Sequence, residues 1–303
     1  MTQLKWLLFK LAFFYPRVYA FFCYYRKKGR RKEIEGKFTY FLQERLGPKK
    51  RKKVVRHIFE LRGSRKVMNY LIPLMDEQFI ERYVTTEGLH YLDRALEKGR
   101  GVVLMTGHFG NGHLAFSALR AMNYDLTFIK GGMPRTPGRY RFRYVNTPDN
   151  TIFIHDPSLA GDYKERILQT LRSGKIIHYY GDTREGRVKE NLSFLGRTMG
   201  FSTGIIHLAH QANAVIIPMI HLYQRGRIAL IFKEPIDHDW IKGRDEYGRI
   251  VSEFAKLIET YLLALPEQYL GVYGPTVLAY SYRFRGIEAQ PAAKSEKSHA
   301  SPF

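Results

Sequence analysis

The sequence predicts an α/β fold in which a mostly parallel sheet is flanked by helices. Short apolar runs rich in β-branched residues alternate with helical patterns of about a dozen residues, which is typical of parallel sheets covered on both faces. The hydrophobic share of the 303 residues is 45%, which is enough for a packed core and excludes a disordered chain. The expected strands are 101–106, 124–129, 151–155, 175–180, 214–220 and 227–232.

Helical spacing of apolar residues covers the chain from residue 50 to about 98, with Pro73 as an expected kink. Between the strands, helices are expected over 114–122, 163–174 and 204–212. The tail from Gly286 has few hydrophobic residues and is expected to be disordered. The sequence therefore predicts a basic, aromatic-rich region over 1–66, an α/β domain over 67–285, and a tail over 286–303.

Positive charge is concentrated near the N-terminus. The chain has 49 Lys and Arg against 28 Asp and Glu, a net charge of +21, and residues 1–66 alone hold 20 against 4. A region this basic indicates a polyanionic partner, either nucleic acid or an anionic membrane surface. No zinc-finger, leucine-zipper or aromatic RNA-binding signature accompanies the charge, so nucleic acid is not expected.

The residues beside the charge favour the membrane. Residues 4–25 are dense in Leu, Phe, Tyr and Trp, and two basic clusters follow at 26–32 and 49–56. This combination predicts a helix embedded in the headgroup region of an anionic leaflet, with a core helix as the alternative. Lys5, Lys10 and Arg17 interrupt the apolar stretch, so neither a simple membrane span nor a secretory signal is expected.

Several kinds of site are disfavoured by the residues present. The lone Cys23 excludes a disulfide framework and a cysteine-based zinc site. His207 and His210 are spaced to face one metal from a helix, but no third ligand has a recognisable spacing, so no metal or other cofactor is expected. The chain has no nucleotide-type phosphate loop and no Gly-x-Ser-x-Gly motif, which disfavours a serine acyl-enzyme.

The most reactive-looking segment is GHFGNGH over 107–113, which follows an expected strand. In α/β sheets, reactive groups collect where strands end and loops begin. Glycines there let the backbone approach a ligand, and a histidine such as His108 is placed to accept a proton. A tight turn that holds a structural histidine explains the same composition, and the residues alone do not decide between these readings.

A longer pattern resembles a known family. The run EGLHYLDRALEKGRGVVLMTGHFGNGH from Glu87 resembles the bacterial lipid A biosynthesis acyltransferases of the lysophospholipid acyltransferase superfamily, in which an apolar strand leads into His-x-Gly-Asn-Trp-Glu. Further blocks of the family pattern follow in order: LQTLRSGKIIHYYGD over 168–182, Phe194-Leu195-Gly196, Ser202-Thr203-Gly204 and Pro266-Glu267-Gln268-Tyr269. The resemblance covers roughly residues 1–273.

The resemblance implies transfer of a fatty acyl group from an acyl carrier protein or CoA thioester to a hydroxyl or amine of a lipid or glycolipid. It implies that His108 is the general base and that Gly107, Gly110 and Asn111 supply donors to the tetrahedral oxyanion. The acyl thioester is a substrate, so no cofactor is implied. The expected place of work is the cytoplasmic face of the inner membrane, with anionic lipids and acyl carrier protein as partners.

Position 113 departs from the family pattern, because His113 stands where the family has an acid that orients the histidine, and Gly112 replaces the preceding Trp. A neutral His113 can accept a hydrogen bond from His108 but cannot supply negative charge, whose loss from a triad costs about 10⁴ in turnover. Asp182, which follows an expected strand, is the candidate substitute. The alternative is an impaired homologue that binds lipid without turnover.

Arginines after Asp182 are candidates for gripping an anionic group. Arg184, Arg187 and Arg197 are expected to contact a phosphorylated acceptor or the phosphopantetheine of the carrier, since arginine binds phosphate in a bidentate manner. Near the C-terminus, GVYGPTVLAYSYRFR replaces the family's Trp and His-Arg-Arg-Phe-Lys run. This departure leaves the acceptor open, including a non-lipid acceptor such as an amino-containing metabolite.

Overall fold

The computed structural model describes residues 2–42, 46–130, 150–154, 162–183, 189–224, 226–236, 245–273 and 276–278, and it confirms the predicted mostly parallel sheet. A seven-stranded sheet has the strand order β1-β9-β8-β2-β5-β3-β4. Only β8 and β9 pair in the antiparallel direction within it. The strands are β1 (Val84–Glu87), β2 (Val102–Thr106), β3 (Leu126–Lys130), β4 (Thr151–Phe153), β5 (Ile176–Tyr180), β8 (Val215–Gln224) and β9 (Arg227–Phe232).

The six strands expected from the sequence are all present, and three further strands were not predicted. β1 was missed because its four residues, VTTE, are largely exposed and carry no apolar run. The antiparallel hairpin of β6 (Lys189–Phe194) and β7 (Arg197–Ser202) was missed because polar residues dominate both strands. Leu195 and Gly196 form its turn with positive φ values of 53° and 73°, a conformation that glycine adopts readily.

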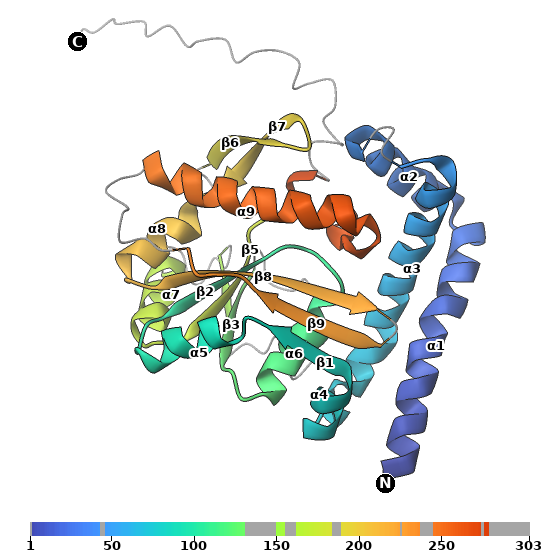
Figure 1. Cartoon of the computed structure of the whole chain (residues 1–303), viewed down its shortest axis with the longest axis horizontal. Coiled ribbons are helices and arrows are strands. Elements are labelled where there is room, and N and C mark those ends of the chain that lie inside the picture. The colour runs from blue at the N-terminus through green and yellow to red at the C-terminus, as the bar shows by residue number, and fades with distance from the viewer. Residues whose placement is uncertain are drawn as a thin grey trace, which may run out of the picture.

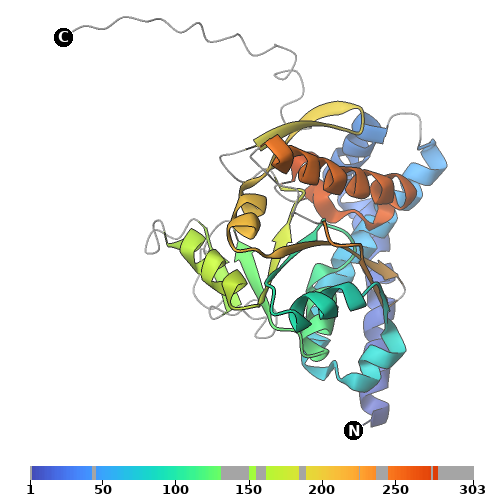
Figure 2. The same ribbon diagram turned by 60° about the vertical axis from the view of Figure 1, so that its left-hand side comes forward.

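Helices lie on both faces of the sheet, as the prediction requires. In both views α9 (Asp245–Ala264) lies above the sheet, while α5 (His90–Glu97) and α6 (Gly112–Ala121) lie below it (Figures 1 and 2). Central strands such as β2 are buried along their whole length, which explains why they appear in the sequence as continuous apolar runs. The other α-helices of the described residues are α1 (Thr2–Arg26), α2 (Lys28–Leu42), α3 (Pro48–Leu71), α4 (Glu77–Tyr83), α7 (Tyr163–Arg172) and α8 (Gly204–Gln211). Short 3₁₀ turns occupy Ile72–Leu74, Pro266–Gln268 and Leu270–Tyr273.

The N-terminal helices belong to the same body as the sheet. α1 runs alongside α3 at one side of the sheet (Figure 1), and Phe9 of α1 packs against Phe79 of α4 with ring centroids 4.7 Å apart. The buried hydrophobic cluster continues without a break from Phe9 to Leu278. The predicted boundary after residue 66 falls inside α3 (Pro48–Leu71). The predicted tail over 286–303 lies outside the described residues.

The first helix has the length and composition of a membrane span. Within the described residues, Gln3–Arg26 is the one helix that is long and apolar enough to cross a membrane, with a mean hydropathy of 1.2 over the best window, of which 28% is buried in the protein. A simple span was not predicted, because Lys10 and Arg17 break the uninterrupted apolar run that such a span usually has. The mean hydropathy of a whole window stays high despite these two charged residues. Length and composition therefore leave both spanning and surface orientations available to α1.

A close approach between α1 and α3 depends on Gly63. A Cβ atom at this position would lie 2.8 Å from the Tyr19 ring and 3.1 Å from the Pro16 Cα of α1. We expect Gly63→Ala to lower the free energy of unfolding by about 1 kcal/mol or more, because overpacking must push the helices apart. Gly29→Ala on α2 is the matched control, since a Cβ there meets nothing within 4 Å. Urea unfolding would measure both, and equal stability of the two variants would show that the α1–α3 spacing is not tight.

Candidate active site

The register of two neighbouring strands brings His108 and Asp182 together. β2 and β5 are parallel neighbours in which Thr106 pairs with Tyr180, the last residue of each strand. His108 and Asp182 each follow two residues later, so both side chains emerge at the same edge of the sheet. Gly107 and Gly181, which precede these two residues, allow α9 to pack closely on the strand ends. A Cβ at Gly107 would lie 2.4 Å from Ile258 of α9, and one at Gly181 would lie 2.5 Å from Phe254. The strand ends therefore place a histidine and a carboxylate side by side.

The carboxylate of Asp182 is fully buried and accepts three hydrogen bonds. The Nδ1 of His108 lies 2.7 Å from Oδ1, and the backbone N–H of His108 donates to Oδ2 at 3.0 Å. The Tyr269 hydroxyl also donates to Oδ2, at 2.8 Å. Burial alone would raise the pKa of Asp182, but the positive charge of His108 and these hydrogen bonds outweigh burial and hold the pKa below its ordinary value. Asp182 is therefore an anion at neutral pH.

An anionic Asp182 fixes the tautomer of His108. Because a carboxylate only accepts, the His108 Nδ1 carries a proton, and in the neutral form of the ring Nε2 keeps a lone pair. The ring stacks on Tyr180 with centroids 3.9 Å apart and an interplanar angle of 16°. About 21% of the His108 side chain is exposed, whereas Asp182 has no exposure. The arrangement therefore presents a basic nitrogen to an approaching substrate and keeps its supporting charge away from water.

A C-terminal segment clamps the loop that carries His108. The backbone N–H of Leu270 donates to the His108 carbonyl at 2.6 Å, and the Gly110 N–H donates to the Gln268 carbonyl at 2.7 Å. The Tyr269 ring packs edge-on against Phe109 with centroids 5.1 Å apart. The predicted donation from Gly110 to an oxyanion does not fit this loop, because the Gly110 N–H already donates to the Gln268 carbonyl. Gly110 instead shapes the loop, with a φ of +45°.

Asn111 is directed at α3. Its side chain is 1% exposed, and its Nδ2 lies 3.4 Å from the Ser64 hydroxyl of α3. Asn111 precedes the first residue of α6, and its carbonyl accepts from the Ala115 N–H at 3.1 Å, but its side chain makes no capping hydrogen bond. The side chain thus holds the loop against α3, and the positive end of α6, which begins at the next residue, is suited to a developing negative charge.

His113 lies at the start of α6 and does not serve as the partner of His108. The expected hydrogen bond from His108 to His113 is replaced by the bond to Asp182, because Asp182 holds the Nδ1 of His108. Burial, followed by the positive charges of Arg65 and Lys130, lowers the pKa of His113 to about 3. His113 is consequently neutral at neutral pH and adds no charge beside His108.

Two further histidines lie behind the loop, deep in the sheet. His178 of β5 and His221 of β8 are each 1% exposed, and both pack against Phe116 of α6. The Nε2 of His178 lies 2.8 Å from the Thr106 hydroxyl. Burial, with the nearby His108 charge, lowers the pKa of His221 to about 3, and burial likewise lowers the pKa of His178. These rings are neutral packing partners of α6.

Of the three candidate arginines, the structure describes Arg197 alone. Arg184 and Arg187 lie outside the described residues. Arg197 lies over the Tyr40 ring of α2 at 3.8 Å and donates to the Tyr40 carbonyl at 3.4 Å, so its contacts are with the N-terminal helices. His207 and His210 both lie 3.2 Å from the Tyr247 hydroxyl, and the described residues contain no group of three side chains able to hold a metal.

Sequence reasoning missed the residues that come from distant segments. Tyr269 was noted as part of a motif, but nothing in the sequence indicated that its hydroxyl meets Asp182. Arg65 and Lys130 lie far apart in the chain, on α3 and β3, and both place positive charge near His113. The only sequence signal for Arg65 was its position at the end of the basic region, where it looked like one more solvated cation.

Comparisons with known proteins identify a matching family and a similar solved structure. The model of the family described as bacterial lipid A biosynthesis acyltransferase matches residues 16–272, a span that includes His108, Asp182 and Tyr269. No curated protein gives a significant match. Among solved structures, the crystal structure of the 1-acyl-sn-glycerophosphate (LPA) acyltransferase PlsC from Thermotoga maritima is similar at 15% identity, over 86% of this chain and 99% of that one, with a TM-score of 0.38.

Replacing His221 by phenylalanine is expected to make the free energy of unfolding depend less steeply on pH below pH 6.5. Folding lowers the pKa of His221 from 6.5 to about 3, so between these values the unfolded chain binds a proton that the folded chain does not. The free energy of unfolding therefore falls as pH decreases, and this residue contributes about 1.4 kcal/mol per pH unit to the slope. Urea unfolding between pH 7 and 4.5 measures that slope. His90→Gln on the surface of α5 should leave it unchanged, and an unchanged slope in His221→Phe would contradict a neutral buried ring.

Proposed function

Because the chain belongs to the bacterial lipid A biosynthesis acyltransferase family, we propose that it transfers a fatty acyl group from an acyl carrier protein or CoA thioester to a hydroxyl or amine of a lipid or glycolipid. The family match confirms the resemblance seen in the sequence and makes the chain an acyltransferase for lipid-like substrates. The observation that carries the finer proposal is the contact between His108 and the buried Asp182 at 2.7 Å.

The proposed reaction begins with proton removal by His108. Its Nε2 takes the proton of the acceptor hydroxyl while the oxygen attacks the thioester carbonyl carbon. The imidazolium that forms is stabilised by the Asp182 carboxylate, and the tetrahedral oxyanion develops beside the positive end of α6. The carbon–sulfur bond then breaks, the ester forms, and His108 returns its proton to the departing thiolate. No acyl-enzyme is needed, and the chain itself is unchanged after each cycle.

The position of Asp182 also bears on the alternative of an impaired, lipid-binding homologue. That alternative rested on the loss of the family's acid at His113, whose neutral ring cannot stabilise an imidazolium. Asp182 supplies the missing negative charge from the loop after β5, at hydrogen-bond distance. The geometry therefore favours an active enzyme in which the supporting acid comes from a different strand.

Substitutions at the three candidate positions separate the two possibilities. With acyl carrier protein bearing a radiolabelled acyl group and a lipid extract as acceptor, His108→Ala should abolish transfer, and Asp182→Asn should lower turnover by about 10⁴. His113→Gln should retain activity, because a neutral side chain replaces a neutral ring. A large gain on changing His113 to Glu, with no loss in Asp182→Asn, would instead show that the natural protein lacks its orienting acid.

The outer side of α1 supports association with a membrane. One side of this helix packs against α3, and the other exposes a continuous apolar stripe. α3 is rich in Lys and Arg and cannot enter hydrocarbon, so α1 packed on it is suited to lie along the headgroup region. The cytoplasmic face of the inner membrane fits a donor carried by a soluble protein. The stripe comprises Leu4, Leu7, Leu8, Leu11, Phe14, Tyr15, Val18, Phe21, Phe22 and Tyr25.

Polar substitutions in this stripe should weaken membrane binding. Phe14 and Phe21 are 61% and 49% exposed. We expect the double variant Phe14→Gln, Phe21→Gln to bind phosphatidylcholine–phosphatidylglycerol vesicles about tenfold more weakly in co-sedimentation, because the buried aromatic area is lost. Glu253→Gln with Lys256→Gln, both exposed on α9, is the control and should bind normally. Unchanged binding of the phenylalanine variant would place the membrane contact elsewhere.

A further inference from the structure

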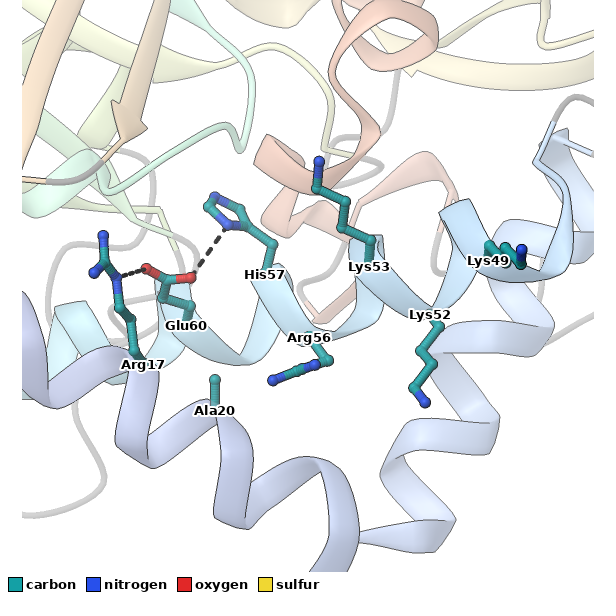
Figure 3. A pocket seen from close by; sticks show the side chains of 8 residues that line it. All are labelled: Arg17, Ala20, Lys49, Lys52, Lys53, Arg56, His57 and Glu60. Carbon is teal, nitrogen blue, oxygen red and sulfur yellow. Dashed lines mark ion pairs between the residues drawn. The ribbon is translucent and has the colours of Figure 1, made fainter.

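A basic hollow lies between α1 and α3, apart from the residues around His108. Its volume is about 460 Å³, which is in the range of small-ligand sites. Figure 3 shows Lys52 and Arg56 extending from α3 on the side where α1 lies, while Arg17 reaches from α1 toward Glu60. The lining residues are Arg17, Ala20, Lys49, Lys52, Lys53, Arg56, His57 and Glu60.

Most of the positive charge in the hollow is uncompensated. The single acid, Glu60, already pairs with Arg17 at 3.7 Å and with His57 at 3.3 Å. Within the described part of the chain, Lys49, Lys53 and Arg56 make no ion pair, and Lys52 contacts only the Tyr24 ring, at 5.9 Å. These four cations are exposed to solvent, and their like charges around one hollow favour a ligand that carries more than one negative charge.

The position of these cations in α3 works against the stability of the helix. α3 begins at Pro48 with no acidic residue in its first turn and no side-chain cap, and residues 49–53 are all basic. Cations at the positive end of a helix are destabilising, by about 0.3–1 kcal/mol each at exposed sites. An anion bound in the hollow would reverse this repulsion, which gives the arrangement a physical reason.

The surroundings of the hollow identify the kind of anion. Arg17 and Ala20 line it from α1, and their neighbours Val18 and Phe21 are exposed members of the apolar stripe. A lipid headgroup beside this stripe would place its phosphate in the hollow and its acyl chains against the stripe. An acidic carrier protein would match the charge, but it offers no counterpart for exposed Phe and Leu side chains.

We propose that the hollow binds the phosphate headgroup of a bilayer phospholipid, with preference for a phosphomonoester. A phosphomonoester carries about −1.5 to −2 charges at neutral pH and three acceptor oxygens, whereas a diester carries a single charge. This lipid is a docking ligand and neither the acyl donor nor the acceptor, so the site goes beyond the proposed transfer reaction. It selects a phosphate in addition to attracting any anionic surface.

The test compares two anionic lipids at equal surface potential. The full chain is titrated with phosphatidylcholine vesicles that contain either phosphatidic acid or phosphatidylglycerol, adjusted to the same zeta potential. The wild type should bind phosphatidic acid vesicles about tenfold more tightly, the effect of one additional charge-assisted hydrogen bond. Equal binding of the two kinds of vesicle would overturn the proposal.

Two double variants that remove equal charge locate the preference. Lys52→Gln with Arg56→Gln changes the hollow, and Lys28→Gln with Lys32→Gln changes exposed cations with the same spacing on α2. The α2 variant should weaken binding to both vesicles and keep their ratio, whereas the hollow variant should bring the ratio to about one. Circular dichroism checks folding, and Lys49→Gln with Lys53→Gln replaces the hollow pair if that variant does not fold.

Other outcomes identify a different occupant. If the hollow variant keeps the lipid preference, the hollow is not the headgroup site and the proposal fails. If it also loses binding to purified acyl carrier protein, the occupant is that protein. Acyl transfer by the wild type in detergent is measured separately, so equal binding of the two kinds of vesicle by the wild type, with intact transfer, overturns only the headgroup site.

Discussion

The carboxylate of Asp182 is a buried negative charge, and much of the local architecture exists to satisfy it. An unpaired carboxylate in a protein interior is costly, and removing one partner of such a group typically destabilises a fold by several kcal/mol. Here the donors come from the His108 ring, the His108 backbone and the Tyr269 hydroxyl, while the Asp182 carbonyl accepts from Val277. The loops after β2 and β5 and the C-terminal segment therefore converge on one anion.

The departures at Gly112 and His113 follow from this placement of the acid. The family pattern has Trp and Glu at these positions. In this chain a Cβ atom at Gly112 would lie 2.5 Å from the Tyr180 hydroxyl, because Tyr180 stacks on His108 and fills that space. With Asp182 holding the Nδ1 of His108, an acid at position 113 is not needed, and a neutral His113 avoids a second buried anion. Tyr180 thus occupies the space that a larger side chain at position 112 would need.

The strand ends could be predicted from the sequence, and the contacts between distant segments could not. Apolar runs located β2 and β5, and parallel neighbours bring their ends together, so His108 and Asp182 were both within reach of sequence reasoning. Tyr269 was not, because its role depends on a C-terminal segment that pairs Tyr269 with Phe109. The amide of Gly110 was assigned to an oxyanion for the same reason, since its acceptor at Gln268 is 158 residues away. The contact of Arg197 with Tyr40 was likewise out of reach, because it depends on the hairpin β6–β7 lying against α2.

Part of the net charge of +21 lies on α3, which contacts both α1 and the loop that carries His108. Gly63 faces Tyr19 and Pro16 of α1, and the next residue, Ser64, meets Asn111 in the loop of His108. Farther along α3, His57 lies 3.2 Å from Gln268, whose carbonyl holds Gly110. The apolar stripe on the far side of α1 is thus separated from Asn111 by two packed helices, about 20 Å for helices roughly 10 Å thick. A membrane contact at that stripe would hold His108 at a set height above the lipid, where a lipid acceptor and a donor on a soluble carrier can meet.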